Sequence, residues 1–391
     1  SHTSMMTGAF PRETGVSGNS VLNRRTEQIE NLIGDDIFNK DDVVKVDTIY
    51  DLAKKQRGLK TAAVSWPLTR GSKNLDFIIA ESYNQSTYIK TTKPSGFLEK
   101  LEENAIAADR FGPWSALEVS DREDWLTAET ANYLIRHEKP HLMLVHFLVT
   151  DSFSHLYGAG SEEAKWAHEY VDDRVRSIVD TLKAEGIFEK TNIFIVSDHG
   201  WTNITKAVKP NVLLKTLGLL KIDKNENIVS KEAYTVMNHG AAHVYVLNKA
   251  RKDEIVREIK PKLAALEGIE NVYGENDFNR LGLPSTKDPY MADLILEAKE
   301  GYYIVNEHDG ISPLGKVTYV ATHGHDPAKP WMKGTLIAAG PGIKGGVQLT
   351  DVTVRDLAPT IAQLLGLQMP STWPGEGGKY RKGRALTEIL K

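Results

Sequence analysis

Short apolar segments alternate with amphipathic ones along the first two hundred residues of the chain. The apolar segments are typical of strands buried on both faces of a parallel sheet; they are residues 61–66, 142–149 and 192–197. The amphipathic segments carry apolar residues three and four positions apart and indicate helices; they are residues 47–55, 124–136 and 161–183. This alternation predicts an α/β protein with a mostly parallel central sheet flanked by helices.

The pattern changes after Trp201. A lead-in rich in proline, glycine and lysine is followed by a predicted strand, a helix and two further strands, at residues 242–247, 250–266, 269–273 and 293–297. This order suggests a small α+β subdomain inserted into the main sheet. We therefore predict a core made of residues 1–208 and 313–391, interrupted by an inserted subdomain of residues 209–312.

On either side of this insertion the chain keeps the pattern of the core. Residues 317–321 and 334–339 are predicted strands, and residues 354–365 form a predicted helix that ends at Gly366. Residues 1–20 are small and turn-rich, so we expect a loop that wraps around a site.

Composition and charge narrow the range of partners. Of the 391 residues, 41% are hydrophobic and 26% are charged, as in an ordinary globular protein. A net charge of -4 offers no basic excess to neutralise phosphates, so we do not expect binding to a nucleic-acid duplex. No apolar stretch approaches the roughly 18 residues that span a bilayer. The sequence has no cysteine, which excludes disulfides and thiolate metal ligands and fits a reducing or an oxidising compartment.

Acidic and histidine residues follow three of the predicted strands. They are Asp151 and His155 after the second strand, Asp198 and His199 after the third, and His323 and His325 after residues 317–321. Because the carboxyl ends of parallel strands meet at the edge where α/β sheets bind ligands, we expect these side chains to lie together. Carboxylates combined with imidazoles suit zinc or a similar first-row ion and indicate a hydrolytic site, here with two ions.

Packing alone offers a competing interpretation, which is stronger for the first pair than for the second. Asp151 could instead cap a helix, since aspartate is a favoured N-cap, with His155 as an unrelated residue. Asp198 and His199 directly follow the apolar sequence Ile-Phe-Ile-Val, where buried charge is costly unless it is paired or metal-bound. Gly200 is expected to supply the backbone freedom that turns both side chains toward one ion.

The three motifs Asp151-x-x-x-His155, Ser197-Asp198-His199-Gly200 and His323-Gly324-x-Asp326 occur in a characteristic order and spacing. In this respect the chain resembles the alkaline phosphatase superfamily, and most of all its type I phosphodiesterase/nucleotide pyrophosphatase branch. Segments near both ends are similar to that branch as well: Thr7-Gly8 with Pro11 and Gly15, and Asp356 to Gly366 with Gly383-Arg384. The resemblance covers nearly the whole chain outside the insertion and implies an alkaline-phosphatase-like fold.

The resemblance also implies a distribution of ligands. Asp151, His155 and His323 would hold one zinc ion, and Asp198 and His199 would hold the second, together with a further aspartate and the nucleophile. The implied nucleophile lies nine residues before Thr7, upstream of Ser1, so the 391 residues alone are expected to hydrolyse little. Thr3 and Ser4 fall after that position and are weak candidates for the role. Ser1 takes the place of an asparagine that in relatives helps to hold the phosphoryl oxygens.

The function expected from this pattern is a two-metal hydrolase. It would cleave a phosphodiester or pyrophosphate bond of a small phosphorylated substrate, such as a nucleotide, through a covalent phospho-enzyme. Alternatives are a phosphomonoesterase, a phosphonate hydrolase or a sulfatase of the same superfamily, or a non-catalytic metal-binding relative if Ser1 is the true start. The resemblance suggests a periplasmic or secreted protein.

Four residues are candidates for contact with the substrate: Ser1, Trp66, Tyr157 and His325. Trp66 and Tyr157 have rings that can stack on a base or an aromatic leaving group, although core packing explains Trp66 equally well. His325, next but one to His323, is expected beside the metal ligands or facing the substrate. The histidines of the insertion are interpreted as ordinary packing residues: His239, His243 and His308.

Overall fold

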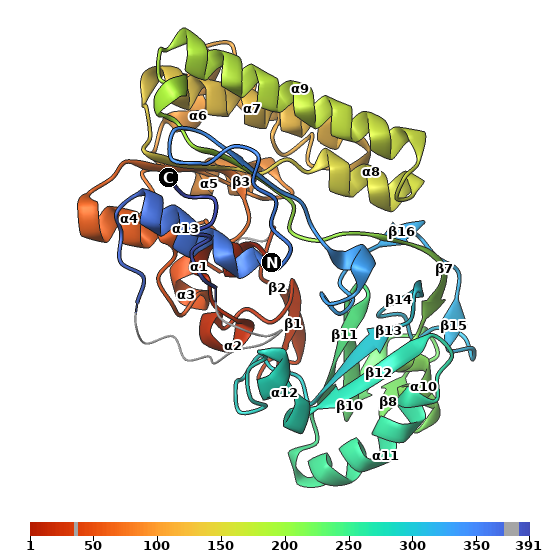
Figure 1. The fold of residues 1–391 in the computed structure, drawn as a ribbon. Helices are drawn as coiled ribbons and strands as arrows, with labels where there is room; N and C mark the ends of the chain where they lie inside the picture. Colours follow the sequence, from red (N-terminus) through yellow and green to blue (C-terminus); the bar gives the residue numbers. More distant parts are fainter. Residues whose placement is uncertain (35–37, 371–382) are drawn as a thin grey trace.

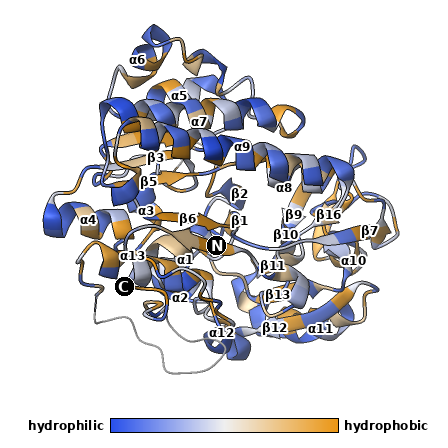
Figure 2. Ribbon diagram, turned by 45° about the horizontal axis from the view of Figure 1, so that its top comes forward, coloured by the Kyte–Doolittle hydropathy of each residue, from blue (hydrophilic) through white to orange (hydrophobic). Residues whose placement is uncertain are grey.

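The computed structural model describes residues 1–34, 38–370 and 383–391 (Figure 1). In the core, β3 (Thr61–Trp66) lies between β4 (Phe77–Ala80) and β5 (Leu142–Val145) and runs parallel to both. A second core sheet pairs β6 (Ile193–Val196) with β17 (Leu336–Ala339) in antiparallel register. Figure 2 shows the apolar strands β3, β5 and β6 in the interior, between helices of mixed polarity.

Helices cover both faces of the β3 sheet (Figure 1). On one face lie α7 (Ser120–His137) and α9 (Glu162–Ala184), and on the other α1 (His2–Thr7), α4 (Ile49–Arg57) and α13 (Leu357–Leu364). Successive strand residues point to opposite faces, so Ala62 and Val64 pack with the α7 side while Ala63 packs with the α4 and α13 side. Among the described residues, no helix combines the length and the apolar character needed to cross a membrane.

A cavity of about 1750 Å³ lies between the two core sheets. Within the described chain, β5 and β6 are each an edge strand of their sheet, and residues of both strands line this cavity. Apolar residues of α9 and α13 line the same space, which continues to the carboxyl ends of the strands. Those strand ends therefore open onto a large internal volume.

Between β6 and β17 the chain forms a second layer of structure. The strands β10 (Ala233–Asn238), β11 (Ala241–Val246), β13 (Leu294–Ala298) and β12 (Ile269–Gly274) form an antiparallel sheet in that order. The helices α10 (Pro210–Thr216) and α11 (Lys252–Ala264) contribute to the same hydrophobic cluster. This sheet falls within the predicted insertion, and the division at residues 209–312 stays a prediction.

One strand, together with the short strands that pair with it, connects this layer to the core. The strand β7 (Thr202–Val208) pairs in parallel with β14 (Gly301–Ile304). It also pairs with the two-residue strands β15 (Leu314–Gly315) and β16 (Ala321–Thr322) in antiparallel register. The predicted strand at 317–321 is therefore wrong in its range. Residues 1–20, predicted as a loop, contain α1 and the short helix α2 (Pro11–Thr14).

The apolar run 142–149 does not form one strand. It divides into β5 and the start of α8 (Val149–Tyr157). The reason lies in α7, where the buried carboxylate of Asp124 accepts hydrogen bonds from the backbone N–H groups of Leu148, at 2.7 Å, and Val149, at 2.9 Å. The first N–H groups of a helix have no partner within the helix itself. Asp124, although distant in the sequence, accepts from two of them, and so it caps α8 and ends the strand.

We predict that Asp124→Ala lowers the free energy of unfolding by about 2 kcal/mol, because two buried N–H groups lose their acceptor. Asp124→Asn keeps one carbonyl acceptor and should lower it by about half as much. Urea denaturation measures both values. As a control, Asp180→Ala removes an exposed carboxylate on α9 and should leave stability unchanged. Equal stability of Asp124→Ala and the native protein would show that the cap does not determine where α8 begins.

Candidate metal centre

Helix α8 presents Asp151 and His155 on one face, because residues four apart on a helix are neighbours. The side chain of Asp151 is 28% exposed and that of His155 is 5% exposed, and His155 Nε2 lies 3.7 Å from Asp151 Oδ2. Asp151 is not the N-cap of α8, because Leu148 occupies that position. The competing interpretation of Asp151 as a helix cap is therefore wrong.

Two of the candidate ligand histidines have one ring nitrogen fixed by a backbone carbonyl. His155 Nδ1 lies 3.0 Å from the carbonyl oxygen of Ala321, and His199 Nδ1 lies 3.2 Å from that of Gly200. A carbonyl can only accept, so Nδ1 carries the hydrogen in both rings and Nε2 keeps its lone pair. His199 Nε2 lies 3.2 Å from Asp198 Oδ2, so both rings offer Nε2 to the centre.

Gly200 matters for a reason other than the predicted one. Its backbone does not adopt the left-handed conformation that favours glycine. Its N–H donates to the carbonyl of Met332 at 3.0 Å, and a Cβ atom here would lie 2.1 Å from the carbonyl oxygen of Trp331. Glycine is needed because the segment carrying Asp198 and His199 lies directly against this neighbouring backbone.

His323 completes the arrangement around Asp151. Its Nε2 lies 3.7 Å from Asp151 Oδ1, as does Nε2 of His199, and the His199 and His323 rings stack with centroids 3.7 Å apart. Three imidazole nitrogens thus surround one carboxylate at a distance too long for a hydrogen bond. This nitrogen–oxygen distance of 3.7 Å is close to the spacing of about 3.3 Å between donor atoms of a tetrahedral zinc site. The donor set therefore fits a first-row divalent ion.

The charges of these groups also favour a cation. Burial, followed by the neighbouring Asp198 and Glu81, raises the pKa of Asp151 well above its usual range. Burial and Asp198 raise the pKa of Glu81, which directly follows β4, to about 8. Burial would also raise the pKa of Asp198, but nearby histidines, above all His199, lower it below the usual range. Burial lowers the pKa of His155 to about 4, so this ring is neutral and able to bind a metal.

We predict that zinc binding at neutral pH releases protons. The raised pKa of Asp151 means that its carboxyl group holds a proton in the metal-free protein, whereas a metal ligand must be deprotonated. Affinity should therefore rise as pH rises through this pKa, and the histidines, already neutral, should contribute no proton. Calorimetry in two buffers with different ionisation enthalpies measures the release. A release equal in the native protein and Asp151→Asn would exclude Asp151 as its source.

The candidate substrate residues divide into two groups. Ser1, Trp66 and His325 line the cavity that contains the metal-ligand candidates. Trp66 is buried at the end of β3, and His325 is buried with no hydrogen-bond partner in the described chain for either ring nitrogen. Tyr157 is 47% exposed and packs on Phe153 at the end of α8, outside the residues that line the cavity.

The structure adds residues that the sequence reasoning missed. His2 Nδ1 lies 3.7 Å from Asp198 Oδ2, and the His2 ring packs against that of His146. Glu81 lines the same cavity, and its position directly after an apolar strand is the signal that could have revealed it. His239, interpreted as ordinary, lies with its ring centroid 4.4 Å from that of His323. No signal in the sequence links this residue of the insertion to the centre.

Fold and site together define an α/β protein with a cluster of histidines and carboxylates at the carboxyl ends of its core strands. The sequence model of the type I phosphodiesterase / nucleotide pyrophosphatase family matches residues 1–326, and the chain belongs to this family.

Individual relatives share only about a quarter of the aligned residues with this chain. Ectonucleotide pyrophosphatase/phosphodiesterase family member 7 of Rattus norvegicus is 24% identical over 227 residues, covering 58% of this chain and 47% of the relative. Bis(5'-adenosyl)-triphosphatase ENPP4 of Homo sapiens is 26% identical over 219 residues, covering 56% and 43%. The chain thus spans less than half the length of these curated relatives.

Solved structures support the fold. Murine ectonucleotide pyrophosphatase / phosphodiesterase 5 superposes with a TM-score of 0.67 and 17% identity, covering 100% of this chain and 87% of that one. An inactive form of the same murine protein in complex with AMP gives the same values. The predicted α/β, alkaline-phosphatase-like fold class is confirmed.

Proposed function

We propose that the protein is a metal-dependent hydrolase that cleaves phosphodiester or pyrophosphate bonds of a small phosphorylated substrate through a covalent phospho-enzyme. The observation that carries the proposal is the convergence of three imidazole Nε2 atoms on the carboxylate of Asp151, each at 3.7 Å. Membership of the type I phosphodiesterase / nucleotide pyrophosphatase family supports the same class of reaction.

In this proposal the centre holds two zinc ions. Asp151, His155 and His323 bind one ion, and Asp198 and His199 bind the other. When bound, such a pair supplies the Lewis acidity that activates an oxygen nucleophile and stabilises the leaving oxygen in a displacement at phosphorus. The mixture of carboxylate and imidazole donors suits zinc better than magnesium or calcium, which prefer oxygen ligands alone.

The chain's own residues prepare the centre for this chemistry. The carbonyls of Ala321 and Gly200 hold two imidazoles with Nε2 directed inward, which fixes the donor positions before an ion arrives. The low exposure of His155, at 5%, limits competition by water. Preorganised donors of this kind need little rearrangement during the reaction.

For the substrate we propose a nucleotide or a related phosphodiester. One relative is named as a bis(5'-adenosyl)-triphosphatase, and a structural neighbour was solved with AMP. Ser1, Trp66 and His325 are proposed to contact the substrate because they line the cavity with the ligand candidates. Tyr157 is proposed as a stacking residue on the strength of its exposed ring alone.

The test is hydrolysis of bis-p-nitrophenyl phosphate by protein expressed from the complete gene. Activity should disappear on treatment with a chelator and return when zinc is added. His199→Ala should remain inactive after the same zinc addition, because it removes a proposed ligand. Activity that survives removal of all metal would overturn the proposal.

We further propose that the protein acts outside the cytoplasm, in the periplasm or after secretion. The names of several relatives describe them as ectonucleotide enzymes. Fractionation of the native cells with an antibody to the protein tests this location. Recovery with a cytosolic marker would contradict it.

A further inference from the structure

The turn between β10 and β11 places a histidine where the backbone favours glycine. Asn238 pairs with Ala241, so His239 and Gly240 form a two-residue hairpin loop. His239 has a φ of 62°, in the left-handed region. Two-residue hairpins with this conformation at the first loop position normally carry glycine there. A side chain in such a conformation costs about 1–3 kcal/mol and is typical of functional sites.

Hydrogen bonds hold this turn against the loop that carries His323. The N–H of Gly240 donates to the carbonyl of His323 at 2.7 Å, and the carbonyl of His239 accepts from the N–H of Ile304 at 2.9 Å. A Cβ atom on Gly240 would lie 2.3 Å from His325 Nδ1, so the turn also packs closely on its other side. The backbone of His239 is therefore fixed relative to the metal centre.

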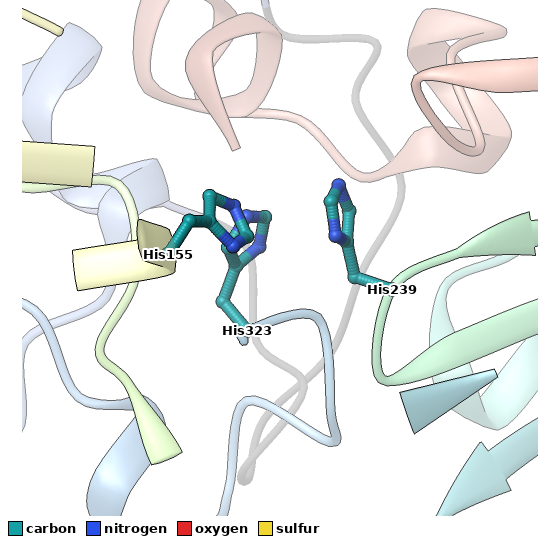
Figure 3. A group of neighbouring side chains, drawn as sticks. All are labelled: His155, His239 and His323. Atoms are coloured by element: carbon teal, nitrogen blue, oxygen red, sulfur yellow. The ribbon is translucent and has the colours of Figure 1, made fainter. Parts of the chain in front are cut away.

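The ring of His239 faces the centre. Its centroid lies 4.4 Å from that of His323 and 5.2 Å from that of His155 (Figure 3). One ligand nitrogen of each ring lies within 4.8 Å of the corresponding nitrogens of the other two. A shift of at most about 1.5 Å would bring these atoms to the spacing of about 3.3 Å expected around tetrahedral zinc.

The imidazole of His239 also lacks a partner of its own. Its Nδ1 is inaccessible to solvent and makes no hydrogen bond within the described chain. Buried polar atoms are nearly always satisfied, so an orphaned one calls for an explanation. Strain, orientation and the orphaned nitrogen all agree with a missing ligand of this imidazole.

We propose that His239 joins Asp151, His155 and His323 as a third imidazole ligand of the metal ion on this side of the centre, so that a substrate oxygen binds this ion as a fifth ligand. The proposal rests on the proposed function, since it concerns the same centre, and it assigns a ligand to the inserted hairpin. Three imidazoles provide a donor set that favours zinc or cobalt over manganese, which prefers oxygen ligands. The hairpin thereby sets the metal selectivity of the core site.

The test compares His239→Gly with the native protein in cobalt titrations followed by visible absorption. Glycine removes the imidazole and suits the positive φ, so the variant should fold and be at least as stable without metal. We expect its cobalt affinity to fall at least tenfold, with a change in the absorption band, while manganese affinity falls less than threefold.

Glu226→Gly is the matched control. Glu226 also has a positive φ, of 63°, in an exposed hairpin loop that does not line the cavity. It should gain the same relief of strain and keep native affinity for cobalt. His239→Gly with cobalt affinity within twofold of native, or with equal losses for cobalt and manganese, would overturn the proposal.

A second variant separates this proposal from the proposed function. If His323→Ala abolishes cobalt binding while His239→Gly does not reduce it, the His239 proposal fails and the metal centre stands. If neither variant reduces cobalt binding, the metal centre itself fails, and with it both proposals.

Discussion

Replacing Asp151 by alanine is expected to lower kcat/KM for bis-p-nitrophenyl phosphate about a thousandfold, or about 4 kcal/mol in the activation barrier. The effect should be large because the Asp151 carboxylate lies 3.7 Å from Nε2 of each of three histidines. Its loss removes the charged donor from the middle of the centre, so metal content should fall together with the rate. Rates and bound metal are measured on protein expressed from the complete gene.

The fold of Asp151→Ala should persist. Burial and the adjacent carboxyl groups of Asp198 and Glu81 raise the pKa of Asp151, so its carboxylate is unfavourable in the absence of a metal. Asp172→Ala on α9 is the matched control, because that carboxylate is 70% exposed and should affect neither activity nor metal content. Native activity and native metal content in Asp151→Ala would exclude the proposed centre.

The helices and strands that were predicted from a strong local sequence pattern agree with the structure. The predicted helix at 161–183 corresponds to α9, and the side chain of its predicted cap, Ser161, accepts from the N–H of Ala164 at 3.0 Å. The predicted strands at 61–66 and 192–197 correspond to β3 and β6, since short apolar runs between helices are typical of buried strands. Periodicity and capping act within a few residues, so the sequence alone reveals them.

Boundaries set by distant residues could not be predicted in this way. The carboxylate of Asp124 ends the apolar run after β5 and starts α8, although it is more than twenty residues away in the chain. This cap explains why Asp151 and His155 share a helix face rather than a turn after a strand. The motif predicted a pair whose side chains the structure places 3.7 Å apart, but both residues lie on a helix.

The candidate site could also be predicted only in part. Asp151, His199 and His323 were expected together from the strand-end pattern and lie together in the structure. His239 was interpreted as a packing residue, because its approach depends on a hairpin held by the N–H of Gly240 and the carbonyl of His323. Such a contact between residues more than eighty positions apart leaves no periodic signal in a single sequence.

The charge of the centre determines which phosphate ester it should prefer. The carboxyl groups of Asp151, Asp198 and Glu81 line the cavity at this end. Burial lowers the pKa of His323 well below its usual range, so its ring adds no positive charge. Three of the basic residues that line the cavity precede the amino ends of core strands: Arg57 precedes β3, Lys139 precedes β5 and Lys190 precedes β6. The backbone of Lys333 lies beside Gly200, but its side chain is exposed. Four strand residues separate the two ends by about 13 Å.

The proposed hydrolase should therefore favour diesters over monoesters by about a hundredfold in kcat/KM. A monoester dianion has a third charged oxygen that needs a cationic partner, and the loss of one such interaction typically costs about a hundredfold. A paired measurement on bis-p-nitrophenyl phosphate and p-nitrophenyl phosphate, using protein expressed from the complete gene, gives the ratio. Lys333→Ala should leave the ratio unchanged, because an exposed ammonium group is screened by solvent. A monoester advantage of tenfold, about 1.4 kcal/mol in the barrier, would instead identify a phosphomonoesterase.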